Sequence, residues 1–263
     1  MESLEEIKKL INEAKNICLI PQETTEPESL TAALALFYTL KELGKNVNLI
    51  IEKIPEKYHF LIPSLDFISS PKNFVISIPT NVANVSSVYY EKNDDSLKIH
   101  LTIDKGTIKK DNLSFYFSEA KPDLVITLGV QDFQKQLSGK LDAFGFLLNA
   151  PILNIDNNQS NKKFGAVNVL QDCALSEMLL EIISSINKNP ITKETATCIL
   201  ADLIVYYNNF QNPKIPLTVF QLCADLMSKG ADREQIIKNI YHQTATKSEP
   251  IPEVTNIAHT NIH

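Results

Sequence analysis

Apolar residues in the first fifty positions alternate between the spacing of a helix and that of a buried strand. The first helix is marked by apolar residues three or four positions apart: Leu4, Ile7, Leu10, Ile11 and Ala14. The run 17–20 (Ile-Cys-Leu-Ile) then predicts a short buried strand. A second helix is predicted over 30–43, ending at Gly44, and a second strand over 47–51. This order predicts two parallel strands joined by a crossover helix.

The next part of the chain changes character. Residues 73–79 predict a third strand, and 85–90 and 97–103 alternate apolar and polar positions around the polar turn 92–96. Such alternation is typical of an antiparallel hairpin with one solvated face. We therefore expect a hairpin insertion over about 83–118, which exposes an edge or an apolar face to another chain or folds back over its own sheet.

Buried parallel strands resume at 123–129 and 151–156, separated by a segment, 131–146, that is expected to be partly helical. Residues 173–243 read as helical, with four segments: 173–187, 192–208, 216–229 and 232–241. The predicted fold class is α/β, a mostly parallel sheet flanked by helices with an inserted β-hairpin and a helical C-terminal part. Residues 1–245 are expected to form one domain, and 246–263 an extended tail.

Composition supports a globular cytoplasmic protein. The chain has 263 residues, of which 44% are hydrophobic, and contains no apolar run as long as the roughly 18 residues that a membrane helix needs. Its N-terminus is acidic rather than a basic region followed by an apolar stretch. The four cysteines lie far apart inside apolar patterns, which predicts buried reduced thiols: Cys18, Cys173, Cys198 and Cys223.

The charge pattern argues against a phosphate clamp. The net charge is −6, and Arg233 is the only arginine. Bidentate recognition of phosphate relies on the guanidinium fork, which lysine replaces only as a point charge. The small basic group at Lys105, Lys109 and Lys110 is therefore interpreted as a solvated turn, not a nucleic-acid footprint.

The stretch 152–168 is the most informative in the chain. An apolar run after Pro151 delivers Asp156 to a strand end, where open α/β sheets place ligands, and Asn157 and Asn158 follow. An Asp-His-His sequence there would bind a divalent metal. A carboxamide offers only a weak carbonyl oxygen in place of the imidazole nitrogen, so Asp-Asn-Asn is a poor metal site.

Four segments in chain order carry a family resemblance. They are a strand-to-helix turn at 22–32, Gly129 at the end of a buried strand, the stretch 156–168 with its Asn-x-x-Phe-Gly-x-x-Asn continuation, and 206–210. In this order they resemble the four motifs of the N-terminal domain of the DHH phosphoesterase family, over about residues 5–243. That family includes oligoribonucleases, cyclic-dinucleotide phosphodiesterases and RecJ-like exonucleases.

The resemblance implies two-metal phosphodiester hydrolysis, in which paired ions bridge a hydroxide and the scissile phosphate. The family's ligand positions are the first-motif histidine and two aspartates, the second-motif aspartate, Asp-His-His, and the fourth-motif aspartate. In this chain they are occupied, in order, by Gln22, Glu26, Glu28, Gly129, Asp156, Asn157, Asn158 and Tyr206. Three carboxylates remain, so any metal that is held would depend on Glu26, Glu28 and Asp156. We expect no resident cofactor; the alternative is Mn or Mg.

The family's smaller substrate-binding domain is expected to be absent, because few residues follow the last matched helix. The leading hypothesis is therefore a catalytically inactive DHH-like protein that acts as a binding or structural subunit, with a protein partner or as a homo-oligomer. The alternative is a metal-dependent phosphodiesterase on short oligonucleotides or cyclic dinucleotides with a rearranged metal site. A third hypothesis is a sensor that binds a nucleotide without cleaving it. No membrane association is expected.

Simpler interpretations stand beside the site hypotheses. Glu26 and Glu28 suit the first turn of a helix because of its macrodipole, with or without a metal. The polar side chains after Asp156 either bind a small polar ligand or stabilise turns through their own backbone. Tyr206 either stacks a base or fills the former metal cavity. No histidine has a ligand-like neighbour in sequence, and Asp132 and Asp202 are weak candidates to replace lost ligands.

Overall fold

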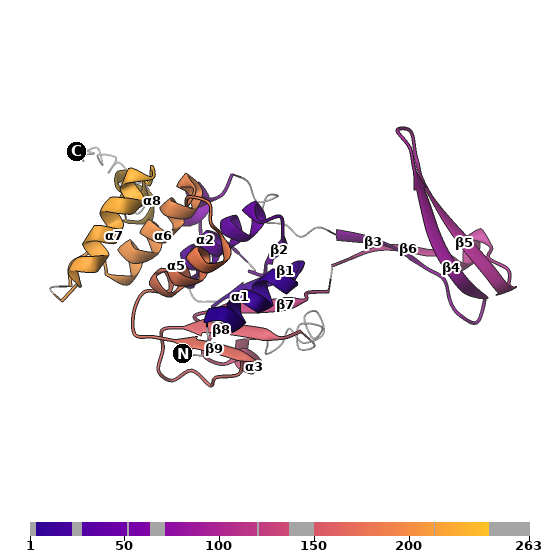
Figure 1. Ribbon diagram of the computed structural model, residues 1–263, viewed down its shortest axis with the longest axis horizontal. Helices are drawn as coiled ribbons and strands as arrows, with labels where there is room; N and C mark the ends of the chain where they lie inside the picture. Colours follow the sequence, from indigo (N-terminus) through magenta and orange to yellow (C-terminus); the bar gives the residue numbers. More distant parts are fainter. Residues whose placement is uncertain are drawn as a thin grey trace, which may run out of the picture.

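A five-stranded parallel sheet forms the centre of the protein (Figure 1). The computed structural model describes residues 4–22, 28–51, 53–63, 72–119, 121–136, 150–212 and 214–241. In spatial order the strands are β2 (Asn46–Leu49), β1 (Asn16–Pro21), β7 (Leu124–Leu128), β8 (Ile152–Asp156) and β9 (Val167–Leu170). All four pairings are parallel, which confirms the predicted α/β class. The edge strand β9 was not predicted, because its apolar run is short and is interrupted by Asn168.

Helices pack against the sheet and against one another. They are α1 (Leu4–Glu13), α2 (Glu28–Glu42), α3 (Phe133–Gln136), α5 (Leu175–Ile186), α6 (Lys193–Tyr206), α7 (Leu217–Ser228) and α8 (Arg233–Tyr241), with 3-10 helices η1 (Glu56–Leu61) and η3 (Lys110–Asn112). Helix α2 is apolar on nearly all sides because it lies between the sheet and α6. The chain from α5 to α8 confirms the predicted helical C-terminal part (Figure 1).

The core lies on both faces of the sheet. Alternate residues of β1 point to opposite faces: Ile17 and Leu19 join the large core beneath the helices, whereas Cys18 and Ile20 join a smaller cluster. Phe133 of α3 belongs to that smaller cluster and stacks on Phe164 with ring centroids 5.4 Å apart. Within the described ranges, no helix is both long and apolar enough to cross a membrane.

The insertion is a separate antiparallel element that projects from the body (Figure 1). Strands β4 (Ala83–Lys92) and β5 (Leu97–Gly106) form the predicted hairpin. The predicted third strand exists as β3 (Lys72–Ser77), but it stays outside the parallel sheet and pairs antiparallel with β6 (Ser114–Glu119), a strand that was not predicted. The pair β3–β6 is the stem that carries the hairpin. Of the segment 131–146, the described part contains α3; the rest and the tail 246–263 lie outside the described residues.

Candidate functional site

Three of the motif positions lie side by side across the sheet. Pro21 pairs with Leu128, and Leu128 pairs with Ile155. The next residue on each strand, namely Gln22, Gly129 and Asp156, therefore forms a row at the carboxyl edge. Backbone hydrogen bonds hold this row: Gln22 N–H donates to Leu128 and Gly129 N–H to Ile155, each at 2.9 Å. Three of the four segments of the family resemblance thus meet where open α/β sheets bind ligands.

The backbone conformation and neighbours of Gly129 disfavour the carboxylate that the resemblance expects. Its φ is +69°, a left-handed conformation that disfavours any side chain with a Cβ. A Cβ added there would lie 3.2 Å from Cβ of Ser29, 3.6 Å from Leu175 and 3.7 Å from Cβ of Gln22. The N-terminal ends of α2 and α5 therefore border this position, and even a Cβ there would require Ser29 to shift by a few tenths of an ångström.

Asp156 is the one family carboxylate kept in the row, and its oxygens are engaged within the protein. The residue is buried, and its Oδ2 accepts a 2.7 Å hydrogen bond from the Asn161 side-chain amide. Its Oδ1 accepts the backbone N–H of Asn158 at 3.1 Å. A metal would have to compete with both donors for these oxygens.

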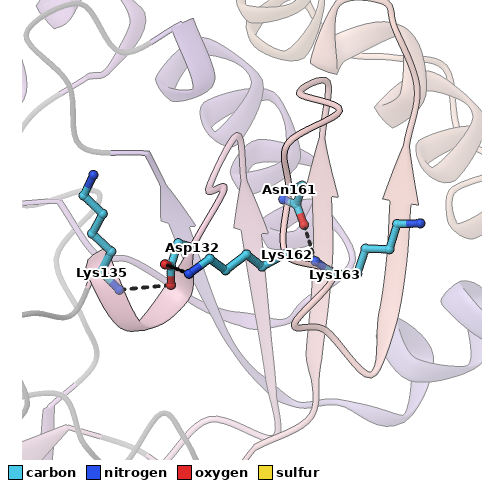
Figure 2. Close-up of polar contacts among 5 residues, drawn as sticks. All are labelled: Asp132, Lys135, Asn161, Lys162 and Lys163. Carbon is cyan, nitrogen blue, oxygen red and sulfur yellow. Dashed lines mark hydrogen bonds and ion pairs between the residues drawn. The ribbon is translucent and has the colours of Figure 1, made fainter.

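The loop after β8 is built from successive Asx turns. Asp156 accepts the N–H of Asn158, Asn158 accepts the N–H of Ser160, and Asn161 accepts the N–H of Lys163, each two residues further on. Figure 2 shows the last of these contacts. Asx side chains favour turns because they bond their own backbone in this way. This observation favours the turn interpretation of these side chains over a ligand site. Asn157 is half-buried in the same loop.

A buried amide network, which the sequence analysis missed, supports the loop from below. Asn154 on β8 accepts the hydroxyl hydrogen of Thr127 at 3.0 Å and donates to the Oδ1 atoms of Asn161 at 2.8 Å and Asn168 at 3.0 Å. Gly165 completes the packing, since a Cβ there would lie 2.9 Å from Cβ of Asn154. Asn154 lies within an apolar run, where the spacing of polar residues gives no sign of its partners.

Tyr206, at the fourth motif, lies at the end of α6 beside acidic groups. Its ring contacts Tyr207 edge to face at 4.9 Å. Burial raises the pKa of Tyr206, and the negative charges of Asp172, Glu177 and Glu28 act in the same direction. The Tyr206 phenol is therefore half-buried and subject to the negative charge of several carboxylates. Glu26 lies outside the described residues.

The two candidate replacement ligands are both held by protein groups. Asp132 pairs with Lys162 and accepts the N–H of Lys135 at 3.2 Å (Figure 2). The hydrogen bond from Lys162 holds the pKa of this carboxyl below its usual range.

Asp202 is buried on α6 and accepts hydrogen bonds from the Thr31 hydroxyl at 3.2 Å and from the Ser176 N–H at 2.9 Å. It thereby caps the first turn of α5 from a neighbouring helix. Burial raises the pKa of Asp202 to about 6.

In the described part of the chain, no three His, Cys, Asp or Glu side chains converge as a possible metal-binding group. Among the cysteines, Cys18, Cys198 and Cys223 are buried and Cys173 is half-buried. Burial raises the pKa of both Cys173 and Cys223 to about 11, so these thiols are poor nucleophiles. His59 contacts the carbonyl of Ile54, and His100 lies on the hairpin.

A hollow of about 350 Å³ lies elsewhere, between α1, β9 and α5. Its lining includes Lys163, Asn168, Gln171, Met178 and Glu181. Lys163 and Asn168 of the stretch 156–168 line this hollow, whereas Gln22, Gly129 and Asp156 do not, so the hollow is separate from the row at the carboxyl edge.

Comparison of the sequence with protein-family models finds no match, and no curated protein matches it. The fold is similar to the crystal structure of an exopolyphosphatase-related protein from Bacteroides fragilis, with a TM-score of 0.66 and 14% sequence identity. The match covers 92% of this chain and 61% of that chain. The chain therefore spans about three fifths of the length of its structural relative. At this identity the likeness establishes that this chain shares the α/β fold of that protein.

Proposed function

We propose that this protein is a degenerate DHH phosphoesterase-like domain that does not hydrolyse phosphodiesters and acts as a binding or structural subunit. The observation that carries the proposal is the state of Asp156. A metal ligand needs free lone pairs directed at the ion. Each Asp156 oxygen already accepts one hydrogen bond within a buried turn, from Asn158 or from Asn161, so a bound ion would have to share these oxygens with the protein.

The neighbouring positions support the same proposal. Gly129 contributes no ligand atom and is closed over by Ser29 and Leu175. Tyr206 contributes a phenol whose pKa is raised by burial, and a neutral phenol is a weak ligand for hard divalent ions. A two-metal mechanism requires carboxylates at such bridging positions.

A turnover assay tests the proposal. The full chain is incubated with Mn²⁺ or Mg²⁺ and with short oligonucleotides, cyclic dinucleotides and inorganic polyphosphate, the last suggested by the name of the structural relative. We expect no turnover above that of the Asp156→Ala variant. Turnover by the wild type that this variant abolishes would overturn the proposal.

The competing function is a metal-dependent phosphodiesterase with a rearranged site. The observation in its favour is that the negative charges of Glu28, Asp172 and Glu177 all act on the phenol of Tyr206. A bound ion stabilises the folded state by mass action, so this function predicts a rise in melting temperature with Mn²⁺, Mg²⁺ or Zn²⁺. We expect no shift, and a shift that is lost in Glu28→Gln would favour the rearranged site.

A further inference from the structure

The hollow between α1, β9 and α5 has an apolar floor. Ile7 of α1 and Met178 and Ile182 of α5 line it, and all three residues are buried. Met178 and Ile182 are four residues apart and therefore lie on the same face of α5. At about 350 Å³ the hollow is near the small end of the range for ligand sites, which is roughly 300–1,000 Å³. It therefore suits a small ligand with one compact apolar group.

Two residues of opposite charge line the same hollow. Lys163 lies in the loop before β9, and Glu181 lies on α5, three residues after Met178. Both residues are exposed, and among the described residues neither charged group has an ion-pair or hydrogen-bond partner. Figure 2 shows that the Lys163 side chain extends away from Asp132 and Lys162, which pair with each other. The hollow therefore offers one cation and one anion to a ligand.

The backbone at Lys163 is strained. Its φ is +50°, in the left-handed region that glycine adopts more easily than lysine. The conformation is fixed within the loop, because the Lys163 N–H donates to the side-chain oxygen of Asn161 at 2.7 Å. The same turn would form at lower cost with glycine. Residues held in this region are concentrated at functional sites, and the side chain retained here is one that lines the hollow.

The free edge of β9 adds main-chain groups to the hollow. The N–H of Gln171 donates to the carbonyl of Asp156 on β8 at 3.4 Å, so the backbone of Gln171 faces the sheet. Backbone groups of successive residues in a strand point to opposite sides, so the N–H and C=O of Leu170 point away from β8. Leu170 lines the hollow, and β9 is the last strand of the sheet in the described part of the chain. An edge strand thus presents one donor and one acceptor beside the two charges.

We propose that this hollow binds a free α-amino acid with an apolar side chain. The ligand carboxylate pairs with Lys163 and accepts the Leu170 N–H. The ligand ammonium pairs with Glu181 and donates to the Leu170 carbonyl, while the apolar side chain lies on Met178 and Ile182. An apolar acid or an apolar amine would match only one of the two charges, so the zwitterion is the ligand that complements the whole lining.

Titration calorimetry of the full chain with L-leucine tests the site. L-leucine has about nine non-hydrogen atoms and meets exposed charges, so we expect a Kd on the order of 0.1 mM. Three analogues each remove one feature: N-acetyl-L-leucine lacks the ammonium, L-leucinamide lacks the carboxylate, and glycine lacks the apolar group. Each analogue is expected to bind about tenfold more weakly than L-leucine.

Charge variants assign each end of the ligand to its residue. Lys163→Gln is expected to weaken L-leucine about fivefold to tenfold and to leave L-leucinamide, which has no carboxylate, within about twofold. Glu181→Gln is expected to weaken L-leucine similarly and to leave N-acetyl-L-leucine within about twofold. Lys162→Gln is the matched control, because this neighbouring lysine pairs with Asp132 and does not line the hollow. It is expected to leave the affinity for L-leucine within about twofold.

The strained backbone separates binding from folding. Lys163→Gly removes the ammonium and relieves the left-handed conformation, since glycine adopts a positive φ without a Cβ clash. This variant is expected to lose affinity for L-leucine as Lys163→Gln does, while its urea midpoint is at or above that of the wild type. A residue that served only the fold would show the opposite, a lower urea midpoint and unchanged binding.

Four outcomes would overturn the site. They are no heat of binding for L-leucine at about 1 mM, ten times the expected Kd; equal affinity for L-leucine and its two blocked analogues; equal losses for Lys162→Gln and Lys163→Gln; or a lower urea midpoint in Lys163→Gly. The hollow lies apart from the row at the carboxyl edge. A silent titration would therefore leave the proposal for Asp156 intact, and turnover in the phosphodiester assay would leave the amino-acid site intact.

Discussion

The side-chain amide of Asn161 donates a 2.7 Å hydrogen bond to the carboxylate of Asp156, and both residues are buried. Asn161 also donates to the carbonyl of Val130 at 2.8 Å, so its amide ties the end of β8 to the segment after β7. The carboxylate that the family resemblance assigns to a metal is thus part of the internal hydrogen bonding that fixes the loop.

Asp156→Ala is expected to destabilise the fold. The change leaves the Asn158 N–H and one Asn161 amide hydrogen without an acceptor, and such buried donors cost about 1–3 kcal/mol each. Urea unfolding measures the loss, with the exposed Asp172→Ala as control, expected to change stability by less than about 0.5 kcal/mol. A variant more stable than the wild type without metal would contradict this role, because removal of repelling carboxylates from a metal site usually stabilises it.

Two glycines with left-handed backbone allow the cost of backbone strain to be measured separately from the cost of a crowded Cβ. Gly44 (φ +73°) has no atom within 4 Å of an added Cβ, whereas Gly129 (φ +69°) has Ser29 at 3.2 Å. Gly44→Ala is expected to cost about 1–2 kcal/mol for the conformation alone. Gly129→Ala adds the cost of shifting Ser29 on α2, so its midpoint in denaturant should fall further. Equal losses would show that the carboxyl edge has room for a side chain at 129.

Asp202 makes stability depend on pH. Burial raises its pKa in the folded protein to about 6, above the roughly 3.9 of an unfolded chain. The stability that protonated Asp202 contributes to the fold is therefore fully present below about pH 4. It is lost as the pH rises through about 6, where the buried carboxyl ionises.

The substitution Asp202→Asn removes this pH dependence of stability and can keep the hydrogen bonds to Ser176 and Thr31. Its oxygen accepts the Ser176 N–H, and its amide donates to Thr31, whose hydroxyl also bonds the Glu28 carbonyl at 2.8 Å. Urea unfolding at pH 4, 6 and 8 is expected to give a variant near wild-type stability at pH 4 and more stable by up to about 3 kcal/mol at pH 8. If the free energy of unfolding changed with pH in the same way for the wild type and the variant, Asp202 would not be the source of the pH dependence.

Replacement by leucine is expected to have opposite effects on stability at two buried asparagines of the parallel sheet. Asn154 is bonded to Thr127, Asn161 and Asn168, so Asn154→Leu leaves several buried groups unsatisfied and is expected to cost at least about 3 kcal/mol. The side-chain oxygen of Asn48 on β2 is buried without a hydrogen-bond partner in the described part of the chain. Asn48→Leu is therefore expected to be neutral or stabilising. Thermal unfolding of both variants distinguishes them, and a similar loss in each would mean that the network contributes little.

Long periodic segments could be predicted from the sequence. Helix α2 and strands β1, β7 and β8 lie close to their predicted bounds, because each carries an apolar pattern long enough to outweigh local irregularity. Strands β6 and β9 were missed, because each is specified by pairing with a strand distant in sequence, which a local pattern does not contain. Position 129 was predicted to lack a ligand, but the closure by Ser29 and Leu175 depends on contacts between distant segments. The same holds for Asn154 and for the burial of Asp202.

The stem of the insertion has a consequence for how the domain is assembled. Lys72 and Glu119 are direct cross-strand partners, so the chain leaves the body and returns to it at a single point. The five parallel strands pair only with one another among the described residues, and none depends on β3 to β6 for a hydrogen-bonded neighbour. The ribbon is therefore a modular appendage: a short linker in place of residues 72–119 preserves the topology of the body, and the ribbon can change length or sequence without altering the register of the central sheet.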